Sequence, residues 1–419
     1  MGSSVSTSRA IGSRRHQRSF WVVAFAFLVV MAFSTVPSPL YGLYRVRDHF
    51  SLFMVTVIYA VYAVGVIGAL LLAGHISDWY GRRRLFLASI CVAIISAIVF
   101  LTSKGLGALL AARLVDGISV GIVLSAATAY MTELGAVGRP DASRGRAQLI
   151  TTATNVGGLG IGAFAAGALA QWVANPLTVP YLVFLVALVL GAIGVALAPE
   201  TQEGPHPRPR YHPQRPYVPP DGRSRYIAAA LSTFMAFAAV GLFVGLAGLF
   251  LAVTLHHPAL VLAGGVIAAM FTGSVLAQIL TASWPVSRVL EAGMAAMVVG
   301  LGVAVLAVWL AHPSLGLFIF GGILIGGGGG AIFKGAVGTV LSISPPDRIA
   351  ESLVGVFLSS YLGLSVPVVG AGITLARNVS PKITILGFAI AVTVGIAGSA
   401  IKLVGGPTAR TSSATKEVG

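Results

Sequence analysis

The most informative stretch of the chain is the short polar segment at positions 74–84, which reads Gly74-His75-Ile76-Ser77-Asp78-Trp79-Tyr80-Gly81-Arg82-Arg83-Arg84. Long apolar segments flank it, at residues 53–73 and 85–101. A carboxylate, two glycines and a run of arginines cannot lie inside hydrocarbon without a large free-energy cost. The pattern therefore predicts a tight turn at a membrane surface, between two membrane-spanning helices.

The composition extends this prediction to the whole chain. Hydrophobic residues make up 56% of the 419 residues and charged residues only 9%, whereas a soluble protein needs more charge to cover its surface. Apolar runs of about 20 residues recur, each long enough to cross a bilayer. Backbone groups in lipid must be hydrogen-bonded within their own segment, so each run is expected to be a helix. We expect an all-α membrane protein without a sizeable soluble domain.

Twelve spans are predicted, at residues 19–41, 53–73, 84–102, 106–133, 147–173, 178–198, 226–255, 259–282, 290–311, 314–342, 351–376 and 383–404. The loops on the side of both termini hold 19 Lys and Arg residues, and the loops on the other side hold 5. Positive charge gathers on the cytoplasmic side of membrane proteins. The bias of 19 to 5 therefore indicates cytoplasmic termini. The net charge of +15 reflects these loops, and we expect no nucleic-acid partner.

The longest break between spans runs from Pro199 to Arg225 and contains eight prolines and five arginines. Such a segment is expected to run extended over the cytoplasmic surface. It divides six spans from six. The predicted organisation is an N-tail at 1–18, a six-helix bundle at 19–198, a linker at 199–225, a second six-helix bundle at 226–405 and a C-tail at 406–419.

The turn resembles the loop between the second and third helices of the major facilitator superfamily of secondary transporters. The matching residues are Gly74, Asp78, Gly81, Arg82 and Arg83. The resemblance implies two six-helix bundles that alternate access to a central site, with this loop as a gating motif. An aspartate that makes its contacts in only one conformation shifts the equilibrium between the two conformations of the transporter. Here Trp79 stands where the family usually has a basic residue; the alternative interpretation is a simple positively charged turn.

Further charged residues follow the fourth and sixth spans. Glu133 ends span four, and Arg144 and Arg146 lie in the loop after it. Pro199-Glu200-Thr201 follows span six and is similar to the sequence found there in sugar porters. Together with the arginines of the turn, Glu133, Arg144, Arg146 and Glu200 predict a cytoplasmic charge network. The alternative is a set of separate surface ion pairs, each of which contributes little.

Asp116 is the only acidic residue deep in a predicted span. Arg113 precedes it by three residues, so the two side chains share a helix face. Arg113, Gly117 and Gly121 also match the family's pattern on the fourth helix, which the resemblance links to proton transfer. We expect Asp116 to bind and release a proton and Arg113 to tune its affinity. The alternative is a permanently ionised structural pair.

The resemblance implies a substrate cavity lined by spans one, four, seven and ten, with aromatic walls from neighbouring spans. The candidate residues are Ser34, Thr35, Tyr59, Tyr62, Thr128, Phe234, Lys334 and Tyr361. Lys334 either reaches the membrane surface, favours an anionic substrate, or serves as a counter-charge to Asp116. Pro37, Pro39 and Pro367 are expected to kink their helices, and the glycines at 326–330 indicate a bend or a very close helix crossing.

The sequence has no phosphate-binding loop of the ATP-dependent type, no buried histidine cluster and no pairing of nucleophile and base. Cys91 is the only cysteine, so no intrachain disulfide is possible. We therefore expect no enzyme activity, no cofactor and no metal. The expected partners are a small-molecule substrate, protons and the lipid bilayer, and the protein is expected to be a monomer in a bacterial inner membrane.

The first functional hypothesis is a proton-coupled exporter of small amphipathic molecules. The fifth span carries Gly157, Gly158, Gly160, Gly162 and Gly167 and is similar to the fifth helix of proton-driven drug exporters, although the proline of that helix is absent. A proton-coupled importer of a sugar or small metabolite is the main alternative. A transport-inactive membrane receptor or scaffold is a further alternative.

Overall fold

The apolar runs of the sequence form long helices in the computed structural model, which describes residues 2–73, 76–138, 144–202 and 213–403. The α-helices are α1 (Gly2–Thr35), α2 (Tyr41–Asp48), α3 (Leu52–Ala73), α4 (Ile76–Tyr80), α5 (Arg82–Thr102), α6 (Leu106–Gly138), α7 (Arg144–Trp172), α8 (Val179–Leu197), α9 (Arg223–Leu249), α10 (Leu260–Leu280), α11 (Val286–Trp309), α12 (Leu315–Ile343), α13 (Ile349–Ala376) and α14 (Pro381–Leu403). Short helical turns are η1 (Ser38–Leu40), η2 (Phe250–Thr254) and η3 (Pro346–Arg348).

Within the described residues, twelve helical segments are long and apolar enough to cross a membrane. This confirms the predicted number of spans. The first span extends over Arg15–Asp48 and is divided into α1, η1 and α2. Pro37 and Pro39 lie at the division because proline lacks the N–H that continues a helix. Pro367, by contrast, lies inside the continuous helix α13.

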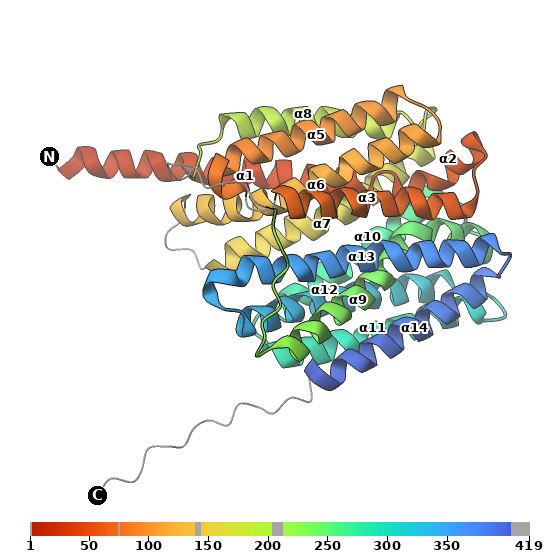
Figure 1. Ribbon diagram of the computed structural model, residues 1–419. Helices are drawn as coiled ribbons and strands as arrows, with labels where there is room; N and C mark the ends of the chain where they lie inside the picture. Colours follow the sequence, from red (N-terminus) through yellow and green to blue (C-terminus); the bar gives the residue numbers. More distant parts are fainter. Residues whose placement is uncertain (1, 74–75, 139–143, 203–212, 404–419) are drawn as a thin grey trace, which may run out of the picture.

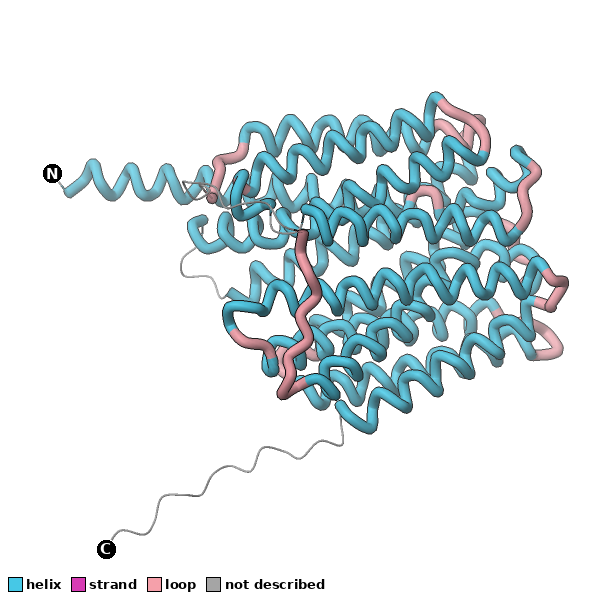
Figure 2. Tube along the Cα trace, viewed as in Figure 1, coloured by secondary structure: helices cyan, strands magenta, loops and turns pink. Residues whose placement is uncertain are grey.

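The helices form two groups, α1–α8 and α9–α14, which lie one above the other in Figure 1. The main contacts between the groups are made by α7 with α10 and by α3 with α13. The start of α1 and the end of α14 lie at the same end of the bundle (Figures 1 and 2). We call this the terminal end, and the other the opposite end.

Glycines bring the two groups together from the middle of the bundle to the opposite end. A Cβ atom at Gly264 of α10 would lie 3.0 Å from the carbonyl carbon of Ala163 in α7. One at Gly372 of α13 would lie 3.0 Å from Cβ of Thr56 in α3. Larger side chains would separate these helices, because packed interiors have no spare volume. The groups are thus tightly packed at the opposite end.

The linker segment, residues 213–222, joins the groups at the terminal end. Figure 2 shows it as a loop that runs across the bundle from the first group to the second. The Gln214 amide donates to the Leu71 carbonyl oxygen near the end of α3, at 2.9 Å. The Tyr217 amide donates to the Glu351 carbonyl oxygen at the start of α13, at 3.2 Å. The segment therefore lies between the ends of the same two helices that pack directly farther along.

The glycine run of α12 allows close helix crossings without interrupting the helix. A Cβ at Gly328 would lie 2.7 Å from the amide nitrogen of Met297 in α11. One at Gly330 would lie 2.8 Å from the carbonyl oxygen of Ser274 in α10. Of the two alternatives that the sequence left open, the close crossing is the one found. It places α12 against two neighbours beside the centre of the bundle.

Candidate functional site

A buried ion pair lies in the first third of α6. The Arg113 guanidinium donates through Nη1 to Oδ2 of Asp116 at 2.7 Å, one helical turn away. Both side chains are 1% exposed. The same nitrogen donates to the Ser34 carbonyl oxygen of α1 at 2.8 Å, and the guanidinium lies 4.4 Å from the centre of the Tyr62 ring. The two side chains share one face of α6, as their spacing predicted, and α1 and α3 also contact the pair.

The pair is incompletely hydrogen-bonded. Oδ1 of Asp116 and Nε of Arg113 are buried and have no hydrogen-bond partner among the described residues. Buried polar atoms usually have partners, so an unpartnered carboxylate oxygen needs an explanation. An oxygen in this position is available to carry a proton. The geometry is therefore compatible with a carboxyl group that changes its protonation state.

Two neighbouring cavities lie between the helix groups. The larger holds about 120 Å³ and the smaller about 80 Å³. They share six lining residues, which are Met31, Leu159, Phe237, Val240, Phe271 and Tyr361. Arg113 lines the smaller cavity. The ion pair thus adjoins the smaller cavity through Arg113.

The predicted cavity residues divide into two sets. Five line the smaller cavity, namely Ser34, Thr35, Tyr59, Tyr62 and Tyr361. The other three do not line either cavity in the described part of the chain. Thr128 is exposed and Phe234 is half-buried. The Phe234 carbonyl faces Gly363 of α13 at a helix contact.

Lys334, the third of these, binds the end of a helix. Its Nζ donates to the carbonyl oxygens of Thr281 at 2.7 Å and Gln278 at 3.2 Å, at the C-terminus of α10. A cation there is favourable because the last carbonyls of a helix carry partial negative charge. Among the described residues Asp116 is paired with Arg113 and not with Lys334. The counter-charge alternative for Lys334 is therefore wrong in this conformation.

Some cavity residues were not predicted. The larger cavity is lined by Ser274 and Gln278 of α10 and by Asn155 of α7, although neither helix was among the four spans expected to line the cavity. Ser274 and Gln278 are four residues apart, and so lie on one helix face. Two polar side chains on one face of an otherwise apolar span were an available signal, because such residues usually face a cavity or a partner.

Charged residues also meet at the terminal end. Arg82 Nε donates to Oε1 of Glu133 at 3.2 Å, and the Thr201 hydroxyl donates to the other oxygen of that carboxylate at 2.5 Å. Oε1 of Glu200 accepts from the backbone amide of Arg83 at 3.2 Å. Three elements of the first helix group, the start of α5, the end of α6 and the segment after α8, are thereby tied together.

Comparison with known proteins agrees with this architecture. The family model described as Major Facilitator Superfamily matches residues 23–365, most of the chain. The chain belongs to the Major Facilitator Superfamily. The crystal structure of a mutant of the nucleoside transporter NupG superposes with a TM-score of 0.71 at 10% sequence identity, covering 92% of this chain and 99% of that one. At this identity the likeness concerns the fold alone.

Two curated relatives match part of this superfamily member. Monosaccharide-sensing protein 2 of Arabidopsis thaliana is 31% identical over 102 residues, which are 24% of this chain and 13% of the relative. The arabinose-proton symporter of Bacillus subtilis is 31% identical over 101 residues, 24% of this chain and 21% of the relative. Each match covers only a small part of the relative.

The superfamily's loop motif is described in part. Gly81 has a φ of 94° and precedes the first residue of α5, a backbone conformation that favours glycine. Arg82 and Arg83 make the contacts given above. Gly74 and the side chains of Asp78, Arg144 and Arg146 lie outside the described residues. Their predicted roles in gating and in the charge network stay predictions.

Proposed function

We propose that this superfamily member is a proton-coupled secondary transporter that moves a small solute through the central cavities by alternating access. The observation that carries the proposal is the position of Arg113, which pairs with Asp116 at 2.7 Å and also lines the smaller cavity. A single side chain in contact with both the proton site and the solute space gives a direct route for coupling.

In the proposed mechanism, ionised Asp116 holds Arg113 in the pair. Protonation of Asp116 removes the negative charge and weakens the attraction between the two groups. Arg113, which already donates to the Ser34 carbonyl oxygen of α1, is then free to donate a further hydrogen bond to a solute. Binding of the solute and binding of the proton thus both change the contacts of Arg113. Each therefore shifts the equilibrium between the two conformations and so affects binding of the other.

The first candidate substrate is a small uncharged molecule rich in hydroxyl groups, taken up together with protons. Hydroxyl side chains line the smaller cavity, from Ser34, Thr35, Ser38, Tyr59, Tyr62 and Tyr361. Arg113 is the one charged residue in the two described linings, which disfavours a cationic solute. The partial similarity to an arabinose-proton symporter supports the same candidate.

Export of a neutral amphipathic molecule is the second candidate, because the larger cavity has a mainly apolar wall. Met31, Phe237, Met270, Phe271, Phe333 and Phe357 contribute to it, and a wall of this kind suits an apolar ring system. Under either candidate we propose that the terminal end faces the cytoplasm of a bacterium, as the excess of Lys and Arg on that side indicates, and that the loop with Asp78 is the gate.

Reconstituted vesicles with an imposed pH gradient test the proposal. Uptake of radiolabelled arabinose and of a neutral fluorescent dye is measured for the wild type, Asp116→Asn and Glu291→Gln. Glu291 is an exposed carboxylate on α11 and is the control. The proposal is supported if uptake of one solute follows the pH gradient and if Asp116→Asn, but not Glu291→Gln, removes this dependence. The solute that is taken up then distinguishes the two candidate substrates. Flux insensitive to the gradient contradicts proton coupling, and a lack of flux for both probes and for a wider solute panel favours the receptor alternative.

A further inference from the structure

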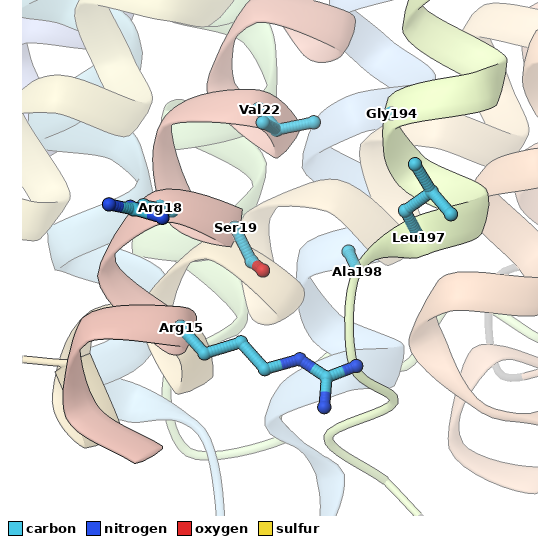
Figure 3. A pocket seen from close by; sticks show the side chains of 7 residues that line it. All are labelled: Arg15, Arg18, Ser19, Val22, Gly194, Leu197 and Ala198. Atoms are coloured by element: carbon cyan, nitrogen blue, oxygen red, sulfur yellow. The ribbon is translucent and has the colours of Figure 1, made fainter. Parts of the chain in front are cut away.

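A third hollow lies away from the two central cavities, in a groove at the terminal end between residues 15–22 of α1 and the end of α8. It holds about 400 Å³ and is lined by Arg15, Arg18, Ser19, Val22, Gly194, Leu197 and Ala198 (Figure 3). All of these residues belong to the first helix group. The transport cycle proposed above makes no use of the groove.

The polar part of the groove comes from one face of α1. Arg18, Ser19 and Val22 lie three, four and seven residues after Arg15, so the four residues are on the same side of the helix. In Figure 3 the Arg15 side chain extends below Ser19 toward Ala198, whereas the Arg18 side chain points away from α8. Both arginines are exposed, and neither makes an ion pair or hydrogen bond with another residue in the part of the chain that the structure describes.

The apolar part of the groove continues toward the middle of the membrane. Gly194 leaves the groove hollow, since a Cβ there would lie 2.6 Å from Cγ1 of Val22. Large apolar side chains beside it are exposed, with Trp21 at 52%, Ile193 at 54% and Leu197 at 74%. All lie in segments long and apolar enough to cross a membrane. We therefore expect this side of the protein to face the lipid chains of the membrane.

We propose that the groove binds an anionic phospholipid, with the phosphate on Arg15 and an acyl chain along Val22, Gly194 and Leu197. Arg18 adds positive charge at the same end of the groove. Arginine forms charge-assisted hydrogen bonds with phosphate oxygens. Basic pockets between membrane helices select anionic headgroups, whereas the ammonium group of a zwitterionic headgroup repels the same arginines. The apolar part of the groove can contact the acyl chain of a lipid, whereas a free phosphate ion would make no use of it.

Native mass spectrometry of the full-length protein tests the proposal. Delipidated protein is titrated with phosphatidylglycerol or phosphatidylcholine of equal chain length, for the wild type and for Arg15→Gln with Arg18→Gln. Arg225→Gln is the matched control, because Arg225 is an exposed arginine at the same end of the molecule but on α9. Removing each groove arginine is expected to weaken phosphatidylglycerol binding on the order of fivefold. The control is expected to bind as the wild type does.

A second arm adds inorganic phosphate as a competitor and separates a lipid site from a phosphate site. Retention of phosphatidylglycerol in excess phosphate, together with weaker binding of phosphatidylcholine, supports the lipid site. Displacement by inorganic phosphate, equal binding of the two lipids, or an equal loss in the Arg225→Gln control overturns it. The arginines are exposed, so their replacement is not expected to unfold the protein, and monodispersity in size exclusion verifies this.

Discussion

The carboxylate of Glu200 caps the first turn of α5, with Oε1 3.2 Å from the amide nitrogen of Arg83. The same oxygen accepts from the amide of Thr201 at 3.1 Å, and Arg83 reaches back to the Ala198 carbonyl oxygen at 3.0 Å. The chain that follows α8 is thus fixed to the N-terminus of α5. Acceptors at a helix N-terminus satisfy amides that have no partner within the helix and interact favourably with its dipole.

Replacing Glu200 with alanine is expected to destabilise the protein. The variant loses the cap of α5, which typically contributes about 0.5–2 kcal/mol. Thermal unfolding in detergent measures the effect, and Glu291→Ala, which removes an exposed carboxylate of α11, is the control. Equal melting temperatures for the two variants would contradict a capping role for Glu200.

Two glycines of α7 are expected to respond oppositely to alanine. A Cβ at Gly162 would lie 2.5 Å from the carbonyl carbon of Ala32 in α1, whereas one at Gly157 would meet no atom within 4 Å. Gly162→Ala should separate α1 from α7 and lower the melting temperature. Gly157→Ala should leave it unchanged or raise it, since alanine favours a helix over glycine by up to about 1 kcal/mol. A similar loss in both variants would show that the helix contact is not the cause.

Much of the fold was predictable because the bilayer restricts what an apolar segment can do. Each of the twelve runs had to be helical, and the pair Arg113 and Asp116 followed from its spacing on α6. The break at Pro37 and Pro39 also followed from local chemistry. Such inferences need only nearby residues, so one sequence is sufficient for them.

The site was less predictable because it depends on contacts between distant segments. Lys334 was interpreted from its depth in a span, but the C-terminus of α10, which it binds, is about 50 residues away in sequence. Gln278 and Asn155 line the cavity only because α7 and α10 pack together. Spacing within one helix cannot reveal which partner a side chain meets, so these roles needed the structure.

The linker segment is expected to stabilise the described conformation. It is hydrogen-bonded to the ends of both α3 and α13, so we expect closure of the terminal end to displace it. Gln214→Pro removes the amide that donates to Leu71, while the extended backbone tolerates proline. Spin labels are attached at Arg84→Cys and Arg225→Cys in a Cys91→Ser background, and the distance between them is measured by electron–electron double resonance. The distribution for Gln214→Pro should shift toward shorter distances than that of the protein with unmodified Gln214.

The control for this prediction is Gln214→Ala, which changes the same side chain and keeps the amide. Its distance distribution should match that of the protein with unmodified Gln214. If the proline and alanine variants give the same distribution, the hydrogen bond to Leu71 does not affect the conformational equilibrium. If the proline variant shifts toward longer distances, the segment holds the two groups together instead.

The buried pair on α6 is expected to behave as a unit in a double-mutant cycle. Arg113→Gln leaves the Asp116 carboxylate without a cation, and breaking a buried pair in this way costs about 3–5 kcal/mol of stability. Asp116→Asn together with Arg113→Gln removes both charges, so the double variant should recover most of that loss. The free energies of unfolding of the four proteins measure the coupling. Additive losses would mean that the two side chains do not depend on each other, and would remove the basis for proton coupling through Arg113.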